Sequence, residues 1–216
     1  MVERRRSAHV LAMLLRRFFQ LSLGLFLFGF STALMLRAGL GLNPWDVFHQ
    51  GVAERLGWSI GAVIVAVGAL VLLLWIPLRE RPGVGTISNM LFVGLAANWS
   101  LSMLPAARGL PAQVAFLVGG IVLQGIAAGV YIGAGLGPGP RDGLMTGLVR
   151  RTGWSIRWVR TGIEAGVVGG GWLLGGTVGI GTLVYAAAIG PLVHVFLPLF
   201  TIAPKTPRES VVVSGE

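Results

Sequence analysis

Two stretches of the chain, 96 residues apart, decide how it folds. The first runs from residue 39 to residue 60 as GLGLNPWDVFHQGVAERLGWSI, and the second runs from residue 135 to residue 156 as GLGPGPRDGLMTGLVRRTGWSI. They are identical at 11 of 22 aligned positions, without a gap. The shared residues include Pro, Asp, Arg, Trp and Ser, which an apolar composition alone does not explain. We therefore interpret the chain as an internal duplication with one copy of this motif in each half.

Each copy of the motif predicts a short helix. In the first copy, Asn43 is a favoured N-cap, Pro44 suits the first helical turn, and Gly57 stands where the helix would end. Pro140 and Gly153 repeat the pattern in the second copy. About 13 residues of helix extend over roughly 19 Å, whereas the hydrocarbon core of a bilayer is about 30 Å thick. The motif therefore predicts a half-membrane or re-entrant helix rather than a full crossing.

The sequence around the two motifs is typical of a membrane protein. Of its 216 residues, 54% are hydrophobic and 12% are charged, about half of the roughly 25% charged residues of a soluble domain. Runs of about 20 apolar residues can cross a bilayer. The chain has six of them, at residues 18–36, 59–78, 85–104, 112–132, 157–174 and 181–200. We expect an all-α membrane protein with six transmembrane helices.

The basic residues indicate an orientation. With both termini in the cytoplasm, 14 basic residues lie inside and three lie outside, as the positive-inside rule requires. The net charge of +9 is then a topology signal, and we expect no nucleic-acid partner. The predicted regions are a basic cytoplasmic N-terminus (1–17), two membrane repeats (18–104 and 105–200) and a disordered cytoplasmic tail (201–216).

The number of crossings in each copy decides how the two copies are related. If the short helices do not cross, each copy has three crossings and the copies are inverted. If they cross, each copy has four crossings and the copies run parallel. In that case 13 basic residues lie inside and four lie outside. The length and polarity of the short helices favour inverted repeats, an arrangement found in many secondary transporters.

Asp46 and Asp142 are the leading candidates for a binding site, because they hold equivalent places in the two motifs. A carboxylate at mid-membrane costs about 2.5–3.5 kcal/mol on insertion scales, so we expect each acid to have a role, and contact with an ion or a substrate is one that is compatible with capping. The alternative is that each acid caps its own helix by accepting the backbone N–H of residue 43 or 139. The other candidates lie at the helix breaks or carry charge within the membrane: Asn43, Pro44, Pro140, Gly41, Gly137, Thr86, Thr182 and Glu164.

Three further features favour plain structural interpretations. Glu164 lies one turn beyond Arg160, which predicts an i,i+4 ion pair, with a proton carrier as the alternative. His49 aligns with Met145, and we interpret it as a histidine at a solvated mouth rather than a proton relay. Glycines at a spacing of four predict close helix packing, or a homodimer through these helices. They are Gly125, Gly129, Gly133, Gly162, Gly166 and Gly170.

The chemistry of the chain favours transport over catalysis. It contains no cysteine, which excludes a thiol nucleophile and a Cys-ligated metal, and it has no zincin motif, nucleophile elbow or convincing catalytic triad. We therefore expect no enzyme, no cofactor and no metal. The leading hypothesis is a transporter or exporter of an unknown small molecule or ion. The alternative is an accessory or scaffold protein that assists another membrane complex. A cavity that reaches both acids favours the transporter, and acids closed off as caps favour the accessory protein.

Three short elements of the chain resemble a known family. The Gly-Leu-Gly-x-x-Pro-x-Asp element, the Gly-Trp-Ser-Ile that follows it and the Gly-x-Gly-Thr before the third span are similar to the YczE/YyaS/YitT-type bacterial membrane proteins, over about residues 18–200. The resemblance implies a multispan protein of the bacterial inner membrane, and it implies little about a substrate. The family's characteristic residues would be Gly39, Gly41, Pro44, Asp46, Gly85 and Thr86, with the partners Gly135, Gly137, Pro140, Asp142, Gly181 and Thr182.

Overall fold

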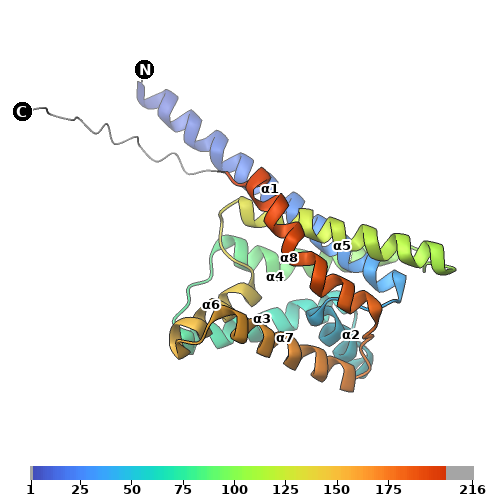
Figure 1. Ribbon diagram of the computed structural model, residues 1–216. Coiled ribbons are helices and arrows are strands. Elements are labelled where there is room, and N and C mark those ends of the chain that lie inside the picture. Colours follow the sequence, from blue (N-terminus) through green and yellow to red (C-terminus); the bar gives the residue numbers. More distant parts are fainter. Residues whose placement is uncertain (1, 203–216) are drawn as a thin grey trace, which may run out of the picture.

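The computed structural model describes residues 2–202, and this part of the chain is all-helical (Figure 1). Both short helices form where the capping residues predict them, and each is followed by a glycine in the left-handed conformation. The helices are α1 (Val2–Ala38), α2 (Pro44–Leu56), α3 (Ile60–Leu78), α4 (Val84–Met103), α5 (Leu110–Gly133), α6 (Pro140–Thr152), α7 (Ile156–Leu173) and α8 (Ile180–Phe200).

Five helices in the described part are long and apolar enough to cross a membrane. They are α1 from Leu11 to Ala38, α3, α4, α5 and α8, and they correspond to five of the six predicted spans. The predicted sixth span, α7, is not among them, since it carries Arg157, Arg160 and Glu164 within 18 residues. The structure therefore confirms a helical membrane protein, and a sixth crossing stays a prediction.

The structure describes parts of the two terminal regions. Helix α1 is continuous from Val2 to Ala38, so residues 2–17 belong to the same helix as the first span. Of the tail predicted to be disordered, Thr201 and Ile202 are described, and residues 203–216 lie outside the described residues.

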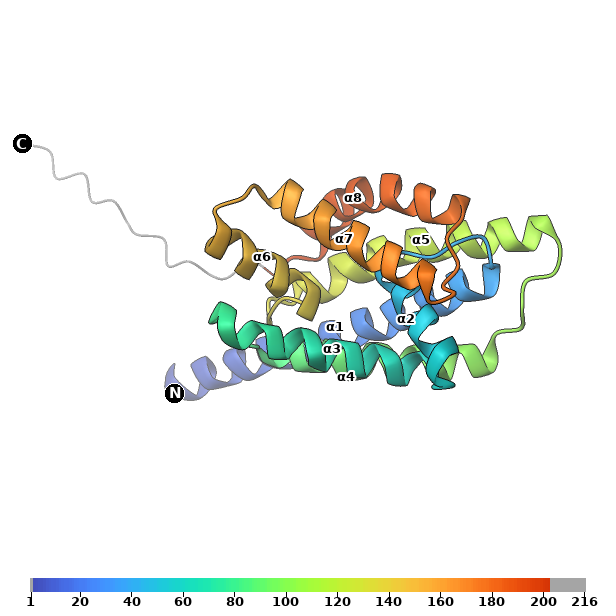
Figure 2. The ribbon, with the colours of Figure 1, turned by 90° about the horizontal axis from the view of Figure 1, so that it is seen from below.

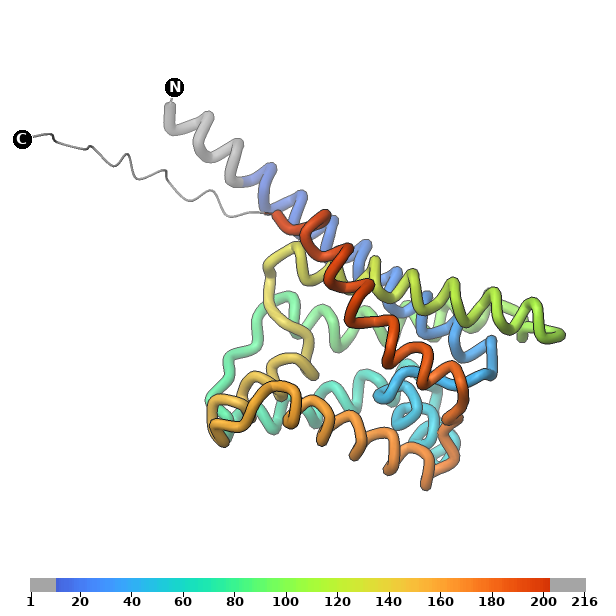
Figure 3. The backbone as a smooth tube through the Cα atoms, viewed as in Figure 1, coloured from blue at the N-terminus to red at the C-terminus, as the bar shows by residue number. Residues whose placement is uncertain are grey.

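The helices form two layers (Figures 1 and 2). In one layer, α4, α1, α5 and α8 stand in a row, because α1 packs on α4 and α5 while α5 packs on α8. In the other layer, α3 and α7 each pack on both short helices, α2 and α6. The tube in Figure 3 shows that α1 and α5 lie side by side and run in opposite directions. Helices α3 and α7 also run in opposite directions.

Matching hydrogen bonds join the two halves of the chain. The backbone N–H of Gly181 donates to the carbonyl of Leu40 at 2.8 Å, and the backbone N–H of Gly85 donates to the carbonyl of Leu136 at 2.8 Å. The two bonds occupy equivalent places, 96 residues apart. Each one ties the loop after the first helix of one half to the start of the last helix of the other half.

Glycine is required at these junctions. Gly41 has a φ of 117° and Gly137 a φ of 126°, a region that residues with a side chain rarely adopt. A Cβ on Gly41 would lie 2.8 Å from Oγ1 of Thr182, and a Cβ on Gly137 would lie 3.1 Å from Oγ1 of Thr86. Thr86 Oγ1 in turn donates to the carbonyl of Pro138 at 2.7 Å. The paired glycines and threonines therefore hold the halves together.

One matching contact is missing from the second half. In the first half, α3 packs on α4 so closely that a Cβ on Gly61 would lie 2.1 Å from the carbonyl oxygen of Gly94. The equivalent residues in the second half are Arg157 and Gly190. Helices α7 and α8 make no comparable contact, and a Cβ on Gly190 would meet no atom within 4 Å. The long side chain at position 157 excludes the close approach that Gly61 permits.

The glycines at a spacing of four behave differently in the two helices that carry them. On α5 they pack on α8, as predicted: a Cβ on Gly129 would lie 2.9 Å from the backbone carbon of Phe196. On α7, a Cβ on Gly162 or Gly166 would meet no atom within 4 Å. The prediction of close packing within the chain is therefore right for α5 and wrong for these two glycines of α7.

Candidate functional site

A cavity of about 320 Å³ lies at the centre of the molecule and is bounded by residues of all eight helices. Its volume is at the lower end of the range of about 300–1,000 Å³ that is usual for small-molecule sites. Aromatic side chains form much of the wall: Phe28, Trp45, Tyr131 and Tyr185. Four charged side chains also line it: Arg141, Asp142, Arg160 and Glu164. Asp142 and Glu164 are predicted site residues, and Arg160 is the predicted ion-pair partner of Glu164.

The predicted site residues fall into three groups. Half of them line the cavity, namely Asn43, Pro44, Pro140, Asp142 and Glu164. Asp46 lies behind the wall, where its neighbour His49 lines the cavity. The remaining four do not line the cavity and lie instead at the junctions between the halves: Gly41, Gly137, Thr86 and Thr182.

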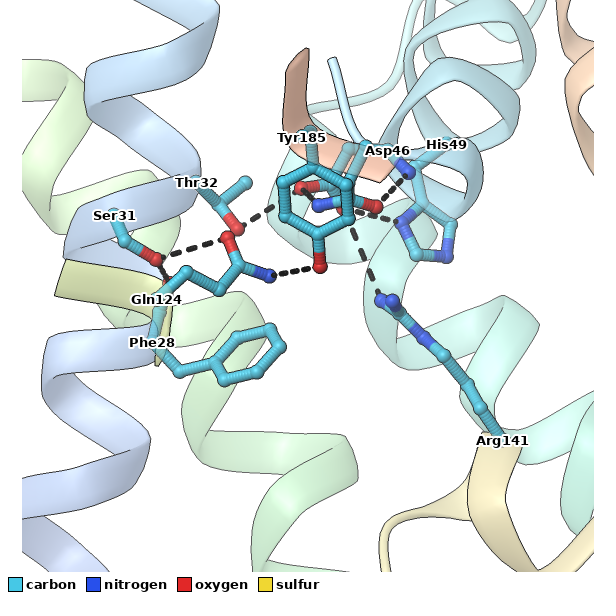
Figure 4. A network of polar contacts seen from close by, with 9 residues as sticks. Phe28, Ser31, Thr32, Asp46, His49, Gln124, Arg141 and Tyr185 are labelled. Carbon is cyan, nitrogen blue, oxygen red and sulfur yellow. Dashed lines mark hydrogen bonds and ion pairs between the residues drawn. The ribbon is translucent and has the colours of Figure 1, made fainter. Parts of the chain in front are cut away.

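Asp46 is the centre of a buried polar network (Figure 4). Its Oδ2 accepts hydrogen bonds from Oγ1 of Thr32, at 3.0 Å, and from Nδ2 of Asn43. Its Oδ1 lies 3.1 Å from Nδ1 of His49 and 3.8 Å from the guanidinium of Arg141. The Asp46 side chain is only 1% exposed. A buried carboxylate is unfavourable unless it is hydrogen-bonded and paired with a cation. These four partners therefore explain how α2 can carry an acid here.

Neither acid caps the backbone of its own helix. Asn43 is the N-cap of α2, and its Oδ1 accepts the backbone N–H of Asp46 at 2.9 Å. In α6 the N-cap is Gly139, which offers no side chain. The Asp142 carboxylate accepts a hydrogen bond from the hydroxyl of Tyr131 at 3.0 Å and faces the cavity. Asn43 thus has the predicted capping role, and the two acids contact side chains instead.

The structure contradicts the interpretation of His49 and confirms the ion pair predicted for Glu164. His49 is 2% exposed and bonded to Asp46, so its placement at a solvated mouth is wrong. The signal for this contact was the i,i+3 spacing of the two residues on one helix face. The ion pair of Arg160 and Glu164 is confirmed, with 2.8 Å between Nε and Oε1, and it lies on the cavity wall.

Several polar residues of the cavity were missed by the sequence analysis. Gln124 lies within α5, where its Oε1 is 3.1 Å from Oγ of Ser31 and its Nε2 donates to the hydroxyl of Tyr185 at 3.4 Å. The guanidinium of Arg141 stacks over Trp45, 5.0 Å from the ring centre. A polar side chain inside an apolar span indicates a functional site or a hydrogen bond between helices. Gln124, within the predicted span 112–132, could have been identified on this basis.

Three known bacterial proteins are similar to this chain. A family model described as a family of unknown function, DUF6198, matches residues 15–198. An uncharacterised protein of Haemophilus influenzae is 37% identical over 181 residues, which cover 84% of this chain and 83% of that protein. The uncharacterised membrane protein YczE of Bacillus subtilis is 34% identical over 177 residues, or 81% of this chain and 82% of YczE.

A more distant relative, the uncharacterised protein YyaS of Bacillus subtilis, is 25% identical over 184 residues. The alignment covers 82% of this chain and 90% of YyaS. Each of the three alignments therefore covers more than four fifths of this chain. No solved structure matches the chain.

Proposed function

The chain belongs to DUF6198, a family of YczE-type membrane proteins, and we propose that this member is a small-molecule transporter or exporter of the inner membrane. Its substrate would bind in the central cavity, between the helices α2 and α6 of the two motifs. The observation that carries the proposal is that residues of all eight helices surround one cavity with charged side chains on its wall. In a membrane, such side chains mark substrate or ion pathways more often than structural positions.

Contact between the two short helices supports this function. The side chain of Arg141, on α6, reaches Asp46, on α2, across the centre of the molecule. Two short helices lying flat and far apart in the membrane interface would have argued against transport. Instead, the first turns of both helices bound the same cavity.

We also propose that the two halves are inverted across the membrane and that α7 crosses it. The opposite directions of α1 and α5 support inversion, as do the matching bonds at Gly85 and Gly181 (Figure 3). Inversion requires three crossings per half, and α7 must then cross despite its charges. Arg160 and Glu164 bond to each other and line the cavity, so the bilayer does not have to solvate them alone. The basic residues place both termini in the cytoplasm.

Each polar residue has a separate role in this proposal. Asp142 and Arg141 contact the substrate, and Tyr131 orients the Asp142 carboxylate. Asp46 acts through other side chains: its network fixes the start of α2 and holds Arg141 at the cavity wall. Asp46 is therefore a positioning residue rather than a direct contact of the substrate.

The burial of Asp46 favours a second candidate function. An acid closed off behind the wall is what we expect of an accessory or scaffold protein that assists another membrane complex. In that case the cavity would carry no substrate, and only the surface of the protein would matter.

Comparison of metabolites in cells with and without the protein tests both candidates. Transport predicts that at least one small molecule changes its ratio between cells and medium, and that Asp142→Asn abolishes the change at equal protein levels in the membrane. Glu54→Gln is the matched control, because Glu54 is an exposed acid outside the cavity. Full activity of Asp142→Asn would rule out the cavity as the transport site. An unchanged metabolite profile, with loss of another membrane complex, would establish the accessory function.

A further inference from the structure

The cavity has an opening on one side, between α7 and α8. Gly190 lies on the cavity wall and is nevertheless exposed at the surface of the molecule. A Cβ on Gly190 would meet no atom within 4 Å, and the same is true of Gly162 and Gly166 on α7. On the opposite side, the equivalent helices α3 and α4 are closed by the contact of Gly61 with Gly94.

The opening is a property of the sequence. Two residues close α3 against α4: Gly61 faces the backbone of Gly94, and Gly68 lies beside Met90. Their equivalents on α7 are Arg157 and Glu164, whose side chains are too large for the same approach. The second half therefore cannot close in the way that the first half does.

In the topology proposed above, in which α7 crosses the membrane, the opening faces the hydrocarbon of the bilayer. Large apolar side chains on the outer surfaces of the two helices are exposed, among them Trp158, Trp172, Leu183, Val195 and Leu199. A lipid-facing surface of this kind is not a path for a solute dissolved in water. A molecule that is itself dissolved in the bilayer can reach the cavity by moving sideways between the helices.

The size of the cavity limits what it can hold. A volume of about 320 Å³ is near the lower limit for a small-molecule site and accommodates a compact polar group. An attached apolar chain would have to remain in the opening, where Ile163, Ile189 and Val193 form part of the wall. A small chamber that carries charged groups, with an exit lined in part by apolar side chains, fits an amphiphile.

Two neighbouring residues on the first turn of α6 define the polar group. Arg141 is 28% exposed, and its ion pair with Asp46, the one it makes within the described part of the chain, is long at 3.8 Å, so most of its five donors are available. Asp142 accepts one hydrogen bond, from Tyr131, and a carboxylate has about four acceptor sites. A cation and an anion side by side are complementary to a head group that carries both charges.

We propose that the transported substrate is an amphiphile with a zwitterionic head, which enters the cavity sideways between α7 and α8. Its anionic group contacts Arg141, its cationic group contacts Asp142, and its apolar chain stays in the opening. The inference rests on the proposed function in placing the substrate in the central cavity. A second copy of the chain is the alternative occupant of the opening, and cross-linking through Gly190→Cys distinguishes it from the amphiphile.

Photolabelling of the protein in phosphatidylglycerol vesicles tests the route. The probe is a single-chain alkyl phosphoethanolamine with a diazirine at the end of the chain, and we expect adducts on α7 and α8. Gly190→Trp fills the opening without meeting another atom at Cβ, so labelling should fall about tenfold, equivalent to about 1.4 kcal/mol. Gly119→Trp is the control, because Gly119 is also exposed and uncrowded but lies on α5, away from the cavity.

Probes with the same chain and different heads test the substrate class. Wild-type protein should be labelled best by the phosphoethanolamine, and less well by the alkyl phosphate and the alkylamine. Arg141→Gln should shift the preference towards the alkylamine, and Asp142→Asn should shift it towards the alkyl phosphate. Stronger labelling of the wild type by either singly charged probe would overturn the zwitterionic assignment.

The two proposals fail in different ways. Equal labelling of Gly190→Trp and wild type would overturn lateral entry, whereas the metabolite comparison would still report on transport. Disulfide-linked dimers of Gly190→Cys, in place of labelling, would show that a second copy covers the opening. Specific labelling together with an unchanged metabolite profile would leave a lipid-binding site in a protein that does not transport.

Discussion

At the scale of single residues, equivalent positions of the two motifs meet at the centre and have taken different roles. Trp45 and Arg141 hold the same place in the two motifs, and their side chains stack on each other at 5.0 Å. Asp46 and Asp142 are also equivalent, yet Asp46 has four partners and is buried, whereas Asp142 has Tyr131 and faces the cavity. Duplication thus supplied a pair of acids, of which one stabilises the fold and the other is available to a ligand.

This difference predicts unequal effects of two matched substitutions on stability. Asp46→Asn removes the charge opposite Arg141 and leaves one of the buried donors around it without an acceptor. The free energy of unfolding should fall by about 1–3 kcal/mol. Asp142→Asn retains an acceptor for Tyr131 and should change it by less than about 1 kcal/mol.

The measurement is unfolding in mixed detergent micelles, followed by tryptophan fluorescence. Glu54→Gln serves again as the control for loss of an exposed acid. Equal losses of stability in the two aspartate variants would contradict the separate roles assigned to these residues.

At the scale of helices, the two halves make an equivalent contact with the large and the small residue on opposite helices. Trp75 on α3 packs against Gly143 on α6, and its Nε1 donates to the carbonyl of Pro140 at 3.0 Å. At the equivalent contact, the small residue is Gly171 on α7 and the larger one is Val47 on α2. Large and small residues therefore exchange sides while the contact is kept. The contact of α3 with α4 is the exception, because α7 and α8 do not reproduce it.

Two equivalent glycines should therefore respond differently to the same substitution. In Gly94→Ala, the new Cβ would lie 2.5 Å from the carbonyl oxygen of Gly61, so α3 and α4 must separate. We expect a loss of about 1–3 kcal/mol in the free energy of unfolding. In Gly190→Ala the Cβ meets no atom, and stability should stay the same or rise by up to about 1 kcal/mol through helix propensity.

Thermal and detergent unfolding of the two purified variants would measure this difference. A destabilised Gly190→Ala protein would contradict an opening between α7 and α8, because it would mean that another surface contacts this glycine.

At the scale of the whole molecule, two features depend on how the halves face each other. The central cavity forms because both short helices point their first turns to the same place. The row of α4, α1, α5 and α8 forms because α1 and α5, running in opposite directions, pack along each other (Figure 1). The inverted arrangement that we propose would place the turns after α2 and α6 on opposite sides of the membrane.

Labelling of single cysteines tests this topology, and the native chain contains no cysteine that would interfere. Trp58 and Trp154 are suitable sites, because they are equivalent, exposed and located in the turns after α2 and α6. In intact cells, an impermeant maleimide should label Trp58→Cys, and it should label Trp154→Cys only after the membrane is opened. Labelling of both variants from the same side would refute inversion.

Much of the architecture could be predicted because its causes are local. The N-cap at Asn43, the prolines at the helix starts and the glycines at the helix ends act within a few residues. Duplication of the motif is visible in the sequence without any structure. Prediction of the site was weaker: Gly41 and Thr86 belong to the same motifs as the acids, but they join the halves instead of lining the cavity. Motif membership alone could not separate these two roles.

The sequence by itself determined that this is a helical membrane protein, where its two short helices begin and end, and that its two halves share one motif. Hydrophobic length, capping and repetition establish these features, since each depends on neighbouring residues or on a direct comparison of sequence. Only the tertiary structure decided that Asp46 is enclosed while Asp142 faces a cavity, and that Gln124 and Tyr185 meet there. It also decided that α3 closes on α4 while α7 and α8 stay apart. These outcomes depend on contacts between helices far apart in the chain, for which no local pattern exists.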